Sequence, residues 1–224
     1  LGSEGNVFGL DEDLAPTLEE LSSRIDDPVM INGVRDTGGR VTLAMFDCNK
    51  PIIAAINGAA VGIGATMTLA ADIRLASSKA RIGFVFGKIG VTPEACSTWF
   101  LPRIVGMSKA LEWVYSAELL SANDAKDGGL VTSISEPDDL LADALAMAKK
   151  FTDNRSPVAT ALARQMMYRN SALSHPMEAH KVDSLAIYYC SLDDGKEGVQ
   201  SFLEKRDPTF TGKTSTMPDF YPWW

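Results

Sequence analysis

The stretch that decides the fold covers residues 50–76 and reads KPIIAAINGAAVGIGATMTLAADIRLA. Its part from Pro51 to Ala71 has no charged side chain and is long enough to cross a bilayer. Asn57-Gly58, however, is a strong turn signal in the middle of this part. The residues Ile52–Ile56 before the turn are only enough for a buried strand. We therefore predict a strand, a turn and a buried small-residue helix, followed by a second strand over Ile73–Ser77.

The flanking sequence continues an α/β pattern. On the N-terminal side, Val41–Cys48 reads as the end of a helix, which Pro51 stops. On the C-terminal side, Thr92 is a suitable N-cap, Pro93 suits the first helical position and Glu94 the first turn, so a helix is predicted from Pro93 onward. Further helices are predicted over residues 108–115, 121–129, 138–150, 157–170 and 177–206, and further extended segments over residues 81–86 and 130–134.

Strands interleaved with helices, followed by a helical part, predict an α/β fold with a helical appendage. Residues 1–40, with nine acidic against three basic side chains, are predicted to form an acidic, lid-like loop region with a short helix near Leu18–Ile25. Residues 41–140 are predicted to form the core. Residues 141–224 are predicted to form a helical C-terminal part that ends in a packed aromatic tail.

Composition narrows the classes of partner. The chain has 224 residues, of which 46% are hydrophobic, enough for one sizeable core. Its formal charge of -8 disfavours nucleic acid, and it disfavours a polyanionic ligand unless local basic residues bind it. Three widely spaced cysteines and two histidines form neither a disulfide framework nor a metal motif. We therefore expect a cytoplasmic protein without a metal, a membrane span or a nucleic-acid partner.

Three glycines mark a strand-to-helix junction at Gly58, Gly62 and Gly64. Such a junction presents unpaired backbone N–H groups at the positive end of a helix dipole, which suits it to hold an oxyanion. The junction lacks the G-x-G-x-x-G spacing of dinucleotide-binding turns and the lysine of a phosphate loop. Close packing of a helix on a strand also selects glycine, so this pattern alone leaves both interpretations open.

A longer series of motifs resembles the enoyl-CoA hydratase/isomerase (crotonase) family. It begins with KPIIAAING at residues 50–58, Gly62-x-Gly64 and DIRLA at residues 72–76. It continues with KARIG, AxxAxxxGLV and EGxxSFLEKR at residues 79–83, 122–131 and 197–206. The resemblance keeps its order from about residue 41 to residue 206, which is most of the chain.

The resemblance implies a fold and a chemistry. Family members are spirals of ββα turns with a C-terminal helical part that mediates trimers, often paired into hexamers. They bind an acyl-coenzyme A thioester and stabilise its enolate, without a further cofactor. By resemblance, the Ile63 N–H is one oxyanion-hole donor. The second donor normally follows an earlier strand, so we expect that strand upstream of Leu1, with Leu1 as the last residue of its donor segment.

Family hydratases use two glutamates, and the matching positions here are Thr66 and Phe86, which cannot act as general acids or bases. A third position lies in VTPEACS at residues 91–97, which is similar to a Pro-Glu-x-Cys-Ser segment of Δ3,Δ2-enoyl-CoA isomerases. The resemblance implies that Glu94 shuttles the proton. We therefore predict enoyl-CoA double-bond isomerisation in fatty-acid or related acyl-CoA metabolism. Without the resemblance, Glu94 would read as an acid that complements a helix dipole.

Other residues are predicted to contact the substrate. By resemblance, Lys205 and Phe202 bind the nucleotide end of coenzyme A, the lysine often from a neighbouring subunit. A solvated lysine and a core phenylalanine are the plain alternative. The predicted substrate site also includes Gly62, Gly64, Thr66 and Phe86. Aromatic side chains that could line an acyl tunnel, or be plain core, are Phe84, Phe86, Trp99 and Phe100.

Three other functions stay open at this point. One is an enoyl-CoA hydratase, a lyase, that uses a non-standard acid. Another is a non-catalytic acyl-CoA-binding homologue, because Thr66 and Phe86 have no carboxyl. An RNA-binding member of the family is disfavoured by the net charge of -8. Glu94 separates enzyme from binder, because a binder needs no carboxylate beside an oxyanion hole.

Overall fold

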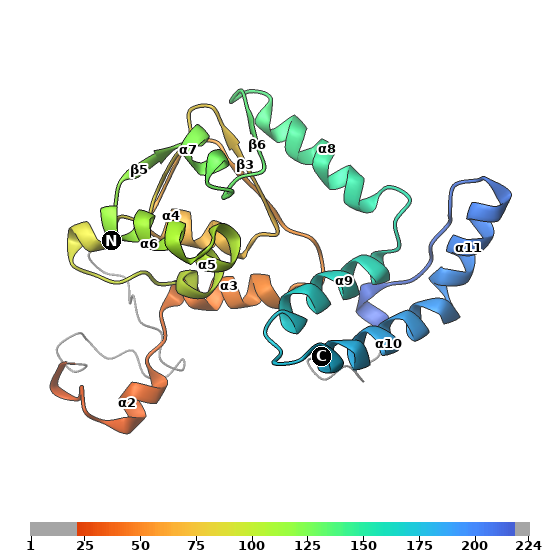
Figure 1. The fold of residues 1–224 in the computed structure, drawn as a ribbon, viewed down its shortest axis with the longest axis horizontal. Coiled ribbons are helices and arrows are strands. Elements are labelled where there is room, and N and C mark those ends of the chain that lie inside the picture. The colour runs from red at the N-terminus through yellow and green to blue at the C-terminus, as the bar shows by residue number, and fades with distance from the viewer. Residues whose placement is uncertain (1–21, 218–224) are drawn as a thin grey trace. The chain divides into compact units, whose positions relative to one another are not determined.

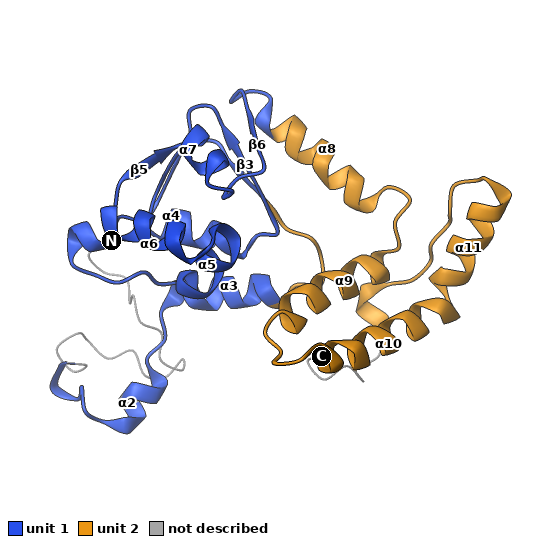
Figure 2. Cartoon of the chain, viewed as in Figure 1, with its two compact units in different colours: residues 1–46, 54–140 blue, residues 47–53, 141–224 orange. Residues whose placement is uncertain are grey.

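The computed structural model of the chain describes residues 22–217, apart from the side chain of Met30 (Figure 1). Most of the predicted lid, the start of the helix near Leu18 and the end of the aromatic tail lie outside these residues. The chain forms two compact units, coloured separately in Figure 2. Unit 1 contains the chain up to Phe46 and Ala54–Leu140, and unit 2 contains Asp47–Ile53 and the chain from Leu141 onward.

Unit 1 is built on two three-stranded sheets. The chain passes from one sheet to the other at Asn57-Gly58 and again between Ser77 and Arg81, whereas the fourth and fifth strands lie in the same sheet. The first sheet has the order β1 (Ile53–Ile56), β3 (Ile73–Ser77), β6 (Ser133–Ser135). The second has the order β2 (Ala59–Val61), β4 (Arg81–Gly83), β5 (Leu119–Ser121).

Both parallel and antiparallel strand pairs occur in the two sheets. β3 pairs parallel with β6 at Leu75 and Ser133, and β2 pairs parallel with β4 at Ala60 and Ile82. β5 runs antiparallel to β4. Each pair of strands followed by a helix thus adds one strand to each sheet, which is one turn of a spiral. The strands predicted from the decisive stretch are confirmed, whereas the three-residue strands β2 and β5 were not predicted.

The core of unit 1 is apolar, and the buried side chain of Arg74 is hydrogen-bonded. Leu75 in β3 and Ile82 in β4 are almost fully buried, as the continuous apolar run of a strand covered on both faces requires. The buried Arg74 guanidinium donates to the carbonyl oxygens of Leu130 at 2.8 Å and Ala71 at 2.5 Å. These bonds satisfy a charge that would otherwise be costly in the core.

The helices around the decisive stretch differ in length from those predicted. The helix that stops before Pro51 is α3 (Thr37–Asp47). The small-residue helix is one α-helical turn, α4 (Ile63–Thr66), continued by the 3₁₀ turn η1 (Met67–Ala70). The extended segment predicted over 81–86 ends with β4, and the 3₁₀ turn η2 (Val85–Ile89) follows it.

The helix predicted from Pro93 is wrong in its start. α5 (Ser97–Val105) begins at Ser97, with Cys96 as its N-cap. The cause is local, because Ala95 and Cys96 have φ values of 55° and 56°. Right-handed helix cannot run through two residues in the left-handed region. Glu94 therefore lies before the helix and outside its first turn.

The next helices follow their sequence signals. α6 (Met107–Ser116) and α7 (Ala122–Asp127) agree with the predictions over 108–115 and 121–129. α7 starts with a capping box, in which the side chain of Ser121 accepts from the N–H of Asp124 and the carboxylate of Asp124 accepts from the N–H of Ser121.

Unit 2 is helical. It contains α8 (Leu140–Thr152), α9 (Pro157–Asn170), α10 (Pro176–Leu192), α11 (Asp194–Glu204) and the 3₁₀ turn η3 (Thr214–Thr216). Proline begins α9 and α10, where its fixed φ costs nothing. Val158 and Leu162 of α9 pack on Val182 and Ala186 of α10 in a common core.

The single helix predicted over 177–206 is two helices. The break lies at Asp193, whose φ of -129° and ψ of -103° are not helical. The next residue, Asp194, is buried and accepts from the Ser156 hydroxyl at 2.6 Å and from the N–H groups of Thr211 and Gly212 at 3.1 and 3.0 Å. This carboxylate ties the start of α11 to α9 and to the chain that follows α11.

Among the described residues, none of the helices has both the length and the apolar character needed to cross a membrane. The interpretation of residues 51–71 as strand, turn and helix is thus confirmed.

Candidate functional site

Glu94 is the carboxylate around which a site can be built. It is half-buried, and its Oε1 accepts a hydrogen bond of 2.5 Å from the Thr66 hydroxyl. Thr66 is the last residue of α4 and is completely buried. Glu94 and Thr66 are thus brought together from positions 28 residues apart. Thr66, which sequence analysis places in the substrate site, orients the carboxylate.

The segment that carries Glu94 is strained and is held at several backbone atoms. Left-handed backbone at a residue other than glycine costs about 1–2 kcal/mol, and Ala95 and Cys96 both adopt it. The Ala95 N–H donates to Asp36 Oδ1 at 3.0 Å, and the Ala95 carbonyl accepts from the Thr42 hydroxyl at 3.0 Å. The Ser97 N–H donates to the Glu94 carbonyl at 3.0 Å. Both polar backbone groups of Ala95 are therefore fixed to α3 or to the residue before it.

Two glycines at the start of α3 allow this close approach. A Cβ at Gly38 would collide with Glu94 Oε2 and with Ile63 Cδ1. A Cβ at Gly39 would collide with the carboxylate of Asp36, 2.8 Å from its Oδ2. Asp36 also accepts from the Gly39 N–H at 2.5 Å, as an N-cap does. The first turn of α3 thus faces both carboxylates and has no side chain in the way.

The surroundings of Glu94 change its acidity. Burial raises the pKa of Glu94 above its ordinary value, and the hydrogen bond from Thr66 works against this rise. The negative charge of Asp36, together with a hydrogen bond between the two side chains, raises the pKa further. Since Glu94 precedes α5, no helical first turn surrounds it as the sequence suggested. A carboxyl with a raised pKa is the better proton acceptor.

Ile63 lies close to this carboxylate, because a Cβ at Gly38 would meet both Glu94 Oε2 and Ile63 Cδ1. It is the first residue of α4, so its N–H has no acceptor within the helix. Gly62 before it has a φ of 57°, which favours glycine, and donates its own N–H to the Gly83 carbonyl at 3.0 Å. The Ile63 side chain is 48% exposed. The structure therefore brings Ile63, Thr66 and Glu94 together.

The other aromatic candidates are in the core of unit 1. Phe84 stacks on Trp113 with ring centroids 6.3 Å apart. Trp99 and Phe100 meet edge to face at 4.8 Å, and Phe46 of α3 packs on both. Phe86 is buried in η2. Their predicted role as an acyl tunnel stays a prediction, as does substrate contact by Phe86, Gly62 and Gly64.

Phe202 and Lys205 lie at the end of α11 in unit 2. The Phe202 side chain is 81% exposed, although an apolar side chain of this size is more often buried. Arg206 is bound bidentately by Glu197, which brings the pKa of Glu197 down to about 2. Among the described residues no ion pair involves Lys205, which is exposed. Contact of Lys205 with a phosphate stays a prediction.

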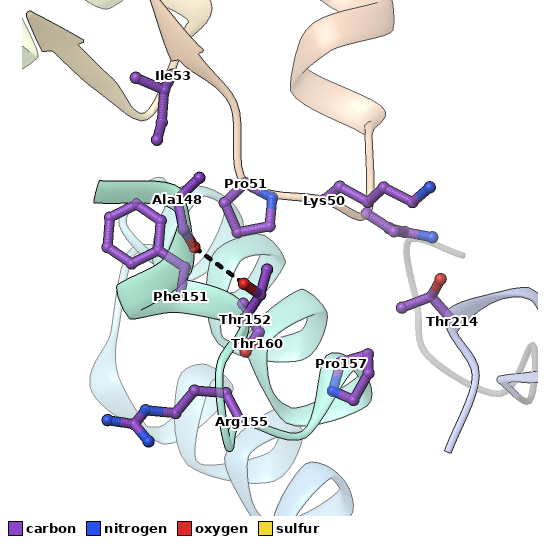
Figure 3. Close-up of a pocket in the computed structure, with 11 residues that line it drawn as sticks. Lys50, Pro51, Ile53, Ala148, Phe151, Thr152, Arg155, Pro157, Thr160 and Thr214 are labelled. Carbon is purple, nitrogen blue, oxygen red and sulfur yellow. Dashed lines mark hydrogen bonds between the residues drawn. The ribbon is translucent and has the colours of Figure 1, made fainter. Parts of the chain in front are cut away.

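A cavity of about 330 Å³ lies in unit 2 (Figure 3). Its apolar lining includes Pro51, Ile53 and Phe151. The Arg155 guanidinium donates to the backbone carbonyl of Asn154 at 3.0 Å. None of its lining residues has a carboxyl group, so it offers no general base. The groups of His, Cys, Asp and Glu within residues 22–217 include none that could hold a metal ion.

Sequence reasoning missed Asp36. An aspartate three residues before Gly39 at the start of a helix is an N-cap signal, and this signal was available. Its second partner, Ala95, is 59 residues away, and no local pattern indicates such a pair.

Comparison with known proteins places the chain among acyl-CoA enzymes. A family model described as enoyl-CoA hydratase/isomerase matches residues 24–213. Enoyl-CoA hydratase ACTT3 of Alternaria alternata is 39% identical over 210 residues, which are 92% of this chain and 68% of the relative. The 1,2-epoxyphenylacetyl-CoA isomerase of Escherichia coli is 34% identical over 167 residues, which are 73% of this chain and 62% of the relative.

The fold gives the same result. The crystal structure of an enoyl-CoA hydratase from Bacillus anthracis matches with a TM-score of 0.75 and 28% identity. The match covers 88% of this chain and 75% of that chain. The predicted α/β spiral with a helical C-terminal part is therefore confirmed.

Proposed function

Because the chain belongs to the enoyl-CoA hydratase/isomerase (crotonase) family, we propose that it isomerises the double bond of an enoyl-CoA thioester, with Glu94 as the proton shuttle. The observation that carries this proposal is the position of Glu94, which faces Ile63 at the start of α4 and is oriented by Thr66. The two positions where family hydratases have glutamates are occupied by Thr66 and Phe86.

One carboxylate is sufficient for this reaction. Glu94 takes a proton from C2 of the 3-enoyl thioester, and the electrons of the C–H bond delocalise into the carbonyl to form an enolate. As the carbonyl re-forms, these electrons make the C2–C3 double bond, and those of the former C3–C4 double bond take the same proton from Glu94 at C4. No net proton, electron or co-reactant is required. A base with a raised pKa suits the first step, and the resulting acid suits the second.

The enolate oxygen needs donors that are already in place. The Ile63 N–H is our candidate for one of these donors. Removing one such donor from an enzyme costs about 2.7–4 kcal/mol of transition-state stabilisation.

The decisive experiment supplies the protein separately with 3-enoyl-CoA and 2-enoyl-CoA. We expect conversion of the 3-enoyl to the 2-enoyl compound without added water in the product. Fast hydration of 2-enoyl-CoA, with the 3-enoyl compound left unchanged, would show that the proposed isomerase assignment is wrong.

A hydratase with a non-standard acid is the second candidate, and one observation favours it. Asp36 stands beside Glu94, so the site has two carboxyl groups, as family hydratases do. Asp36 Oδ1 is already engaged by two backbone N–H groups, however, which leaves it less able to hold a water molecule. A non-catalytic acyl-CoA binder would turn over neither compound.

Binding of the nucleotide end of coenzyme A is predicted to involve Lys205. We expect Lys205→Ala to raise KM for acyl-CoA several-fold and to leave kcat nearly unchanged, because a contact far from the reacting carbons contributes equally to ground and transition states. Lys196→Ala, on the same helix, is the matched control and should change neither constant. Equal wild-type affinity for an acyl-CoA and for its pantetheine analogue would contradict this role.

Assembly into a trimer or a dimer of trimers is predicted from the family resemblance and from the apolar surface of unit 2. Ile187 and Tyr188 of α10 and Phe202 and Leu203 of α11 are each more than 60% exposed. Large exposed apolar side chains that gather on neighbouring helices favour a subunit interface. We expect light scattering at micromolar concentration to give the mass of three or six chains, and a monomer would contradict this.

A further inference from the structure

We propose that Asp36 is the positioning residue for Glu94, a role that rests on the proposed function of Glu94. Asp36 makes two contacts, and a residue with only a capping function would not need the second of them. Its Oδ1 caps α3 through the Gly39 N–H, and the same oxygen accepts from the Ala95 N–H at 3.0 Å. One carboxylate thus connects the start of a helix to the residue after the shuttle.

The second contact holds a conformation that would not persist by itself. Ala95 and Cys96 are left-handed, and alanine gains nothing from that conformation. Asp36 holds the N–H of Ala95, and Thr42 of α3 holds its carbonyl. If Ala95 relaxed to an extended or right-handed conformation, the direction of the chain at Glu94 would change. The carboxylate would then leave Thr66 and Ile63.

Two glycines leave room for the side chains of Glu94 and Asp36. The absence of a side chain at Gly38 leaves room for Glu94, and its absence at Gly39 leaves room for Asp36. A helix start with two consecutive glycines is entropically unfavourable, so a close approach is the physical reason for them here.

Asp36 also acts on Glu94 through its charge. The groups that face Glu94 are the Asp36 carboxyl from the residue before α3 and the Thr66 hydroxyl from α4, and its own segment carries the Cys96 thiol. Asp36 raises the pKa of Glu94, whereas Thr66 lowers it. Removing the charge of Asp36 should therefore move the titration of Glu94 to lower pH, and removing the Thr66 hydroxyl should move it to higher pH.

Four variants separate the charge of Asp36 from its hydrogen bonds to the backbone. Asp36→Asn keeps an oxygen that can accept from Ala95 and Gly39 but removes the charge. Thr42→Val cuts the other bond to Ala95 and changes no charge. Thr66→Val removes the donor to Glu94. Asp36→Ala, which removes the oxygen as well, is expected to lower kcat by about 10²-fold, because small misplacements of reacting groups have effects of this size.

The titration of Glu94 is followed by two independent measurements, the pH dependence of enzyme activity and NMR. The pH profile of kcat/KM should rise at lower pH in Asp36→Asn and at higher pH in Thr66→Val, because Glu94 must be ionised to accept a proton. Thr42→Val, which loosens Ala95 without changing a charge, should lower kcat. Independently, ¹³C NMR of protein labelled at the glutamate carboxyl follows the same titration, with Glu94→Gln identifying the signal.

The results of these measurements support or overturn the proposed role of Asp36. If the NMR midpoint moves to lower pH in Asp36→Asn, Asp36 acts on the Glu94 carboxylate even if the 3-enoyl substrate is never isomerised. If the midpoint of Asp36→Asn equals that of the wild type, and thermal unfolding shows a folded protein, the proposal is overturned. A folded Asp36→Ala with full kcat would overturn it as well.

Discussion

Glu94→Gln is expected to lower the isomerase activity of the protein by about 10²–10⁴-fold, the usual contribution of a general acid–base group. The amide keeps an oxygen that can accept from Thr66, so the side chain should stay in place. It cannot take a proton from C2, however. Binding of acyl-CoA and the midpoint of thermal unfolding should change little, because the substitution removes no apolar contact.

The matched control for this variant is Glu112→Gln. It makes the same chemical change at an exposed ion pair with Lys109 on α6, where the free-energy contribution is small. Steady-state turnover of the 3-enoyl substrate and calorimetric binding of acyl-CoA together decide the result. Retention of the wild-type rate in Glu94→Gln would exclude Glu94 as the shuttle.

Asp194→Ala is expected to have the largest effect on stability, a loss of about 3 kcal/mol in the free energy of unfolding. The variant leaves the Ser156 hydroxyl and the N–H groups of Thr211 and Gly212 without their buried acceptor. It also opens a space, because Gly212 approaches Asp194 too closely for any Cβ. Thermal unfolding should show a Tm lower by about 6–12 °C.

Asp193→Ala is the control for this second variant. The neighbouring aspartate is exposed and its side chain does not cap α11. Its replacement should leave Tm within about 2 °C of the wild type, as surface substitutions usually do. Equal Tm values for both variants would contradict the proposed role of the buried carboxylate.

The fold could be predicted where a local signal and the tertiary structure agree. Residues 52–56 and 73–77 are apolar enough to be strands in any buried context, and β1 and β3 lie there. Pro157 and Ser121 mark helix starts by a mechanism that needs no partner elsewhere in the chain. Such elements are therefore visible in the sequence.

The start of α5 could not be predicted, because a distant residue overrides its local signal. Thr92-Pro93-Glu94 has every feature of a helix start. The bonds from Ala95 to Asp36 and Thr42 instead keep the chain non-helical until Ser97. The strands β2 and β5 were missed for a related reason, since three residues in a strand are too few for a periodic pattern.

The site was predictable only in part. Glu94 and Thr66 were found through resemblance, and the structure adds the hydrogen bond that joins them. The contact between Asp36 and Ala95 depends on how α3 packs, which no spacing in the sequence indicates. Phe202 and Lys205 are exposed on α11, and sequence and structure alike leave their ligand as a prediction.

The left-handed pair Ala95 and Cys96 has a consequence for how this protein responds to selection. Glycine adopts that backbone without cost, so a library sorted only for expression or heat resistance should enrich glycine at both positions. A library sorted for turnover should instead reject glycine there, because a freer backbone no longer holds the carboxylate of the preceding residue. The two sortings should therefore diverge first at these two positions.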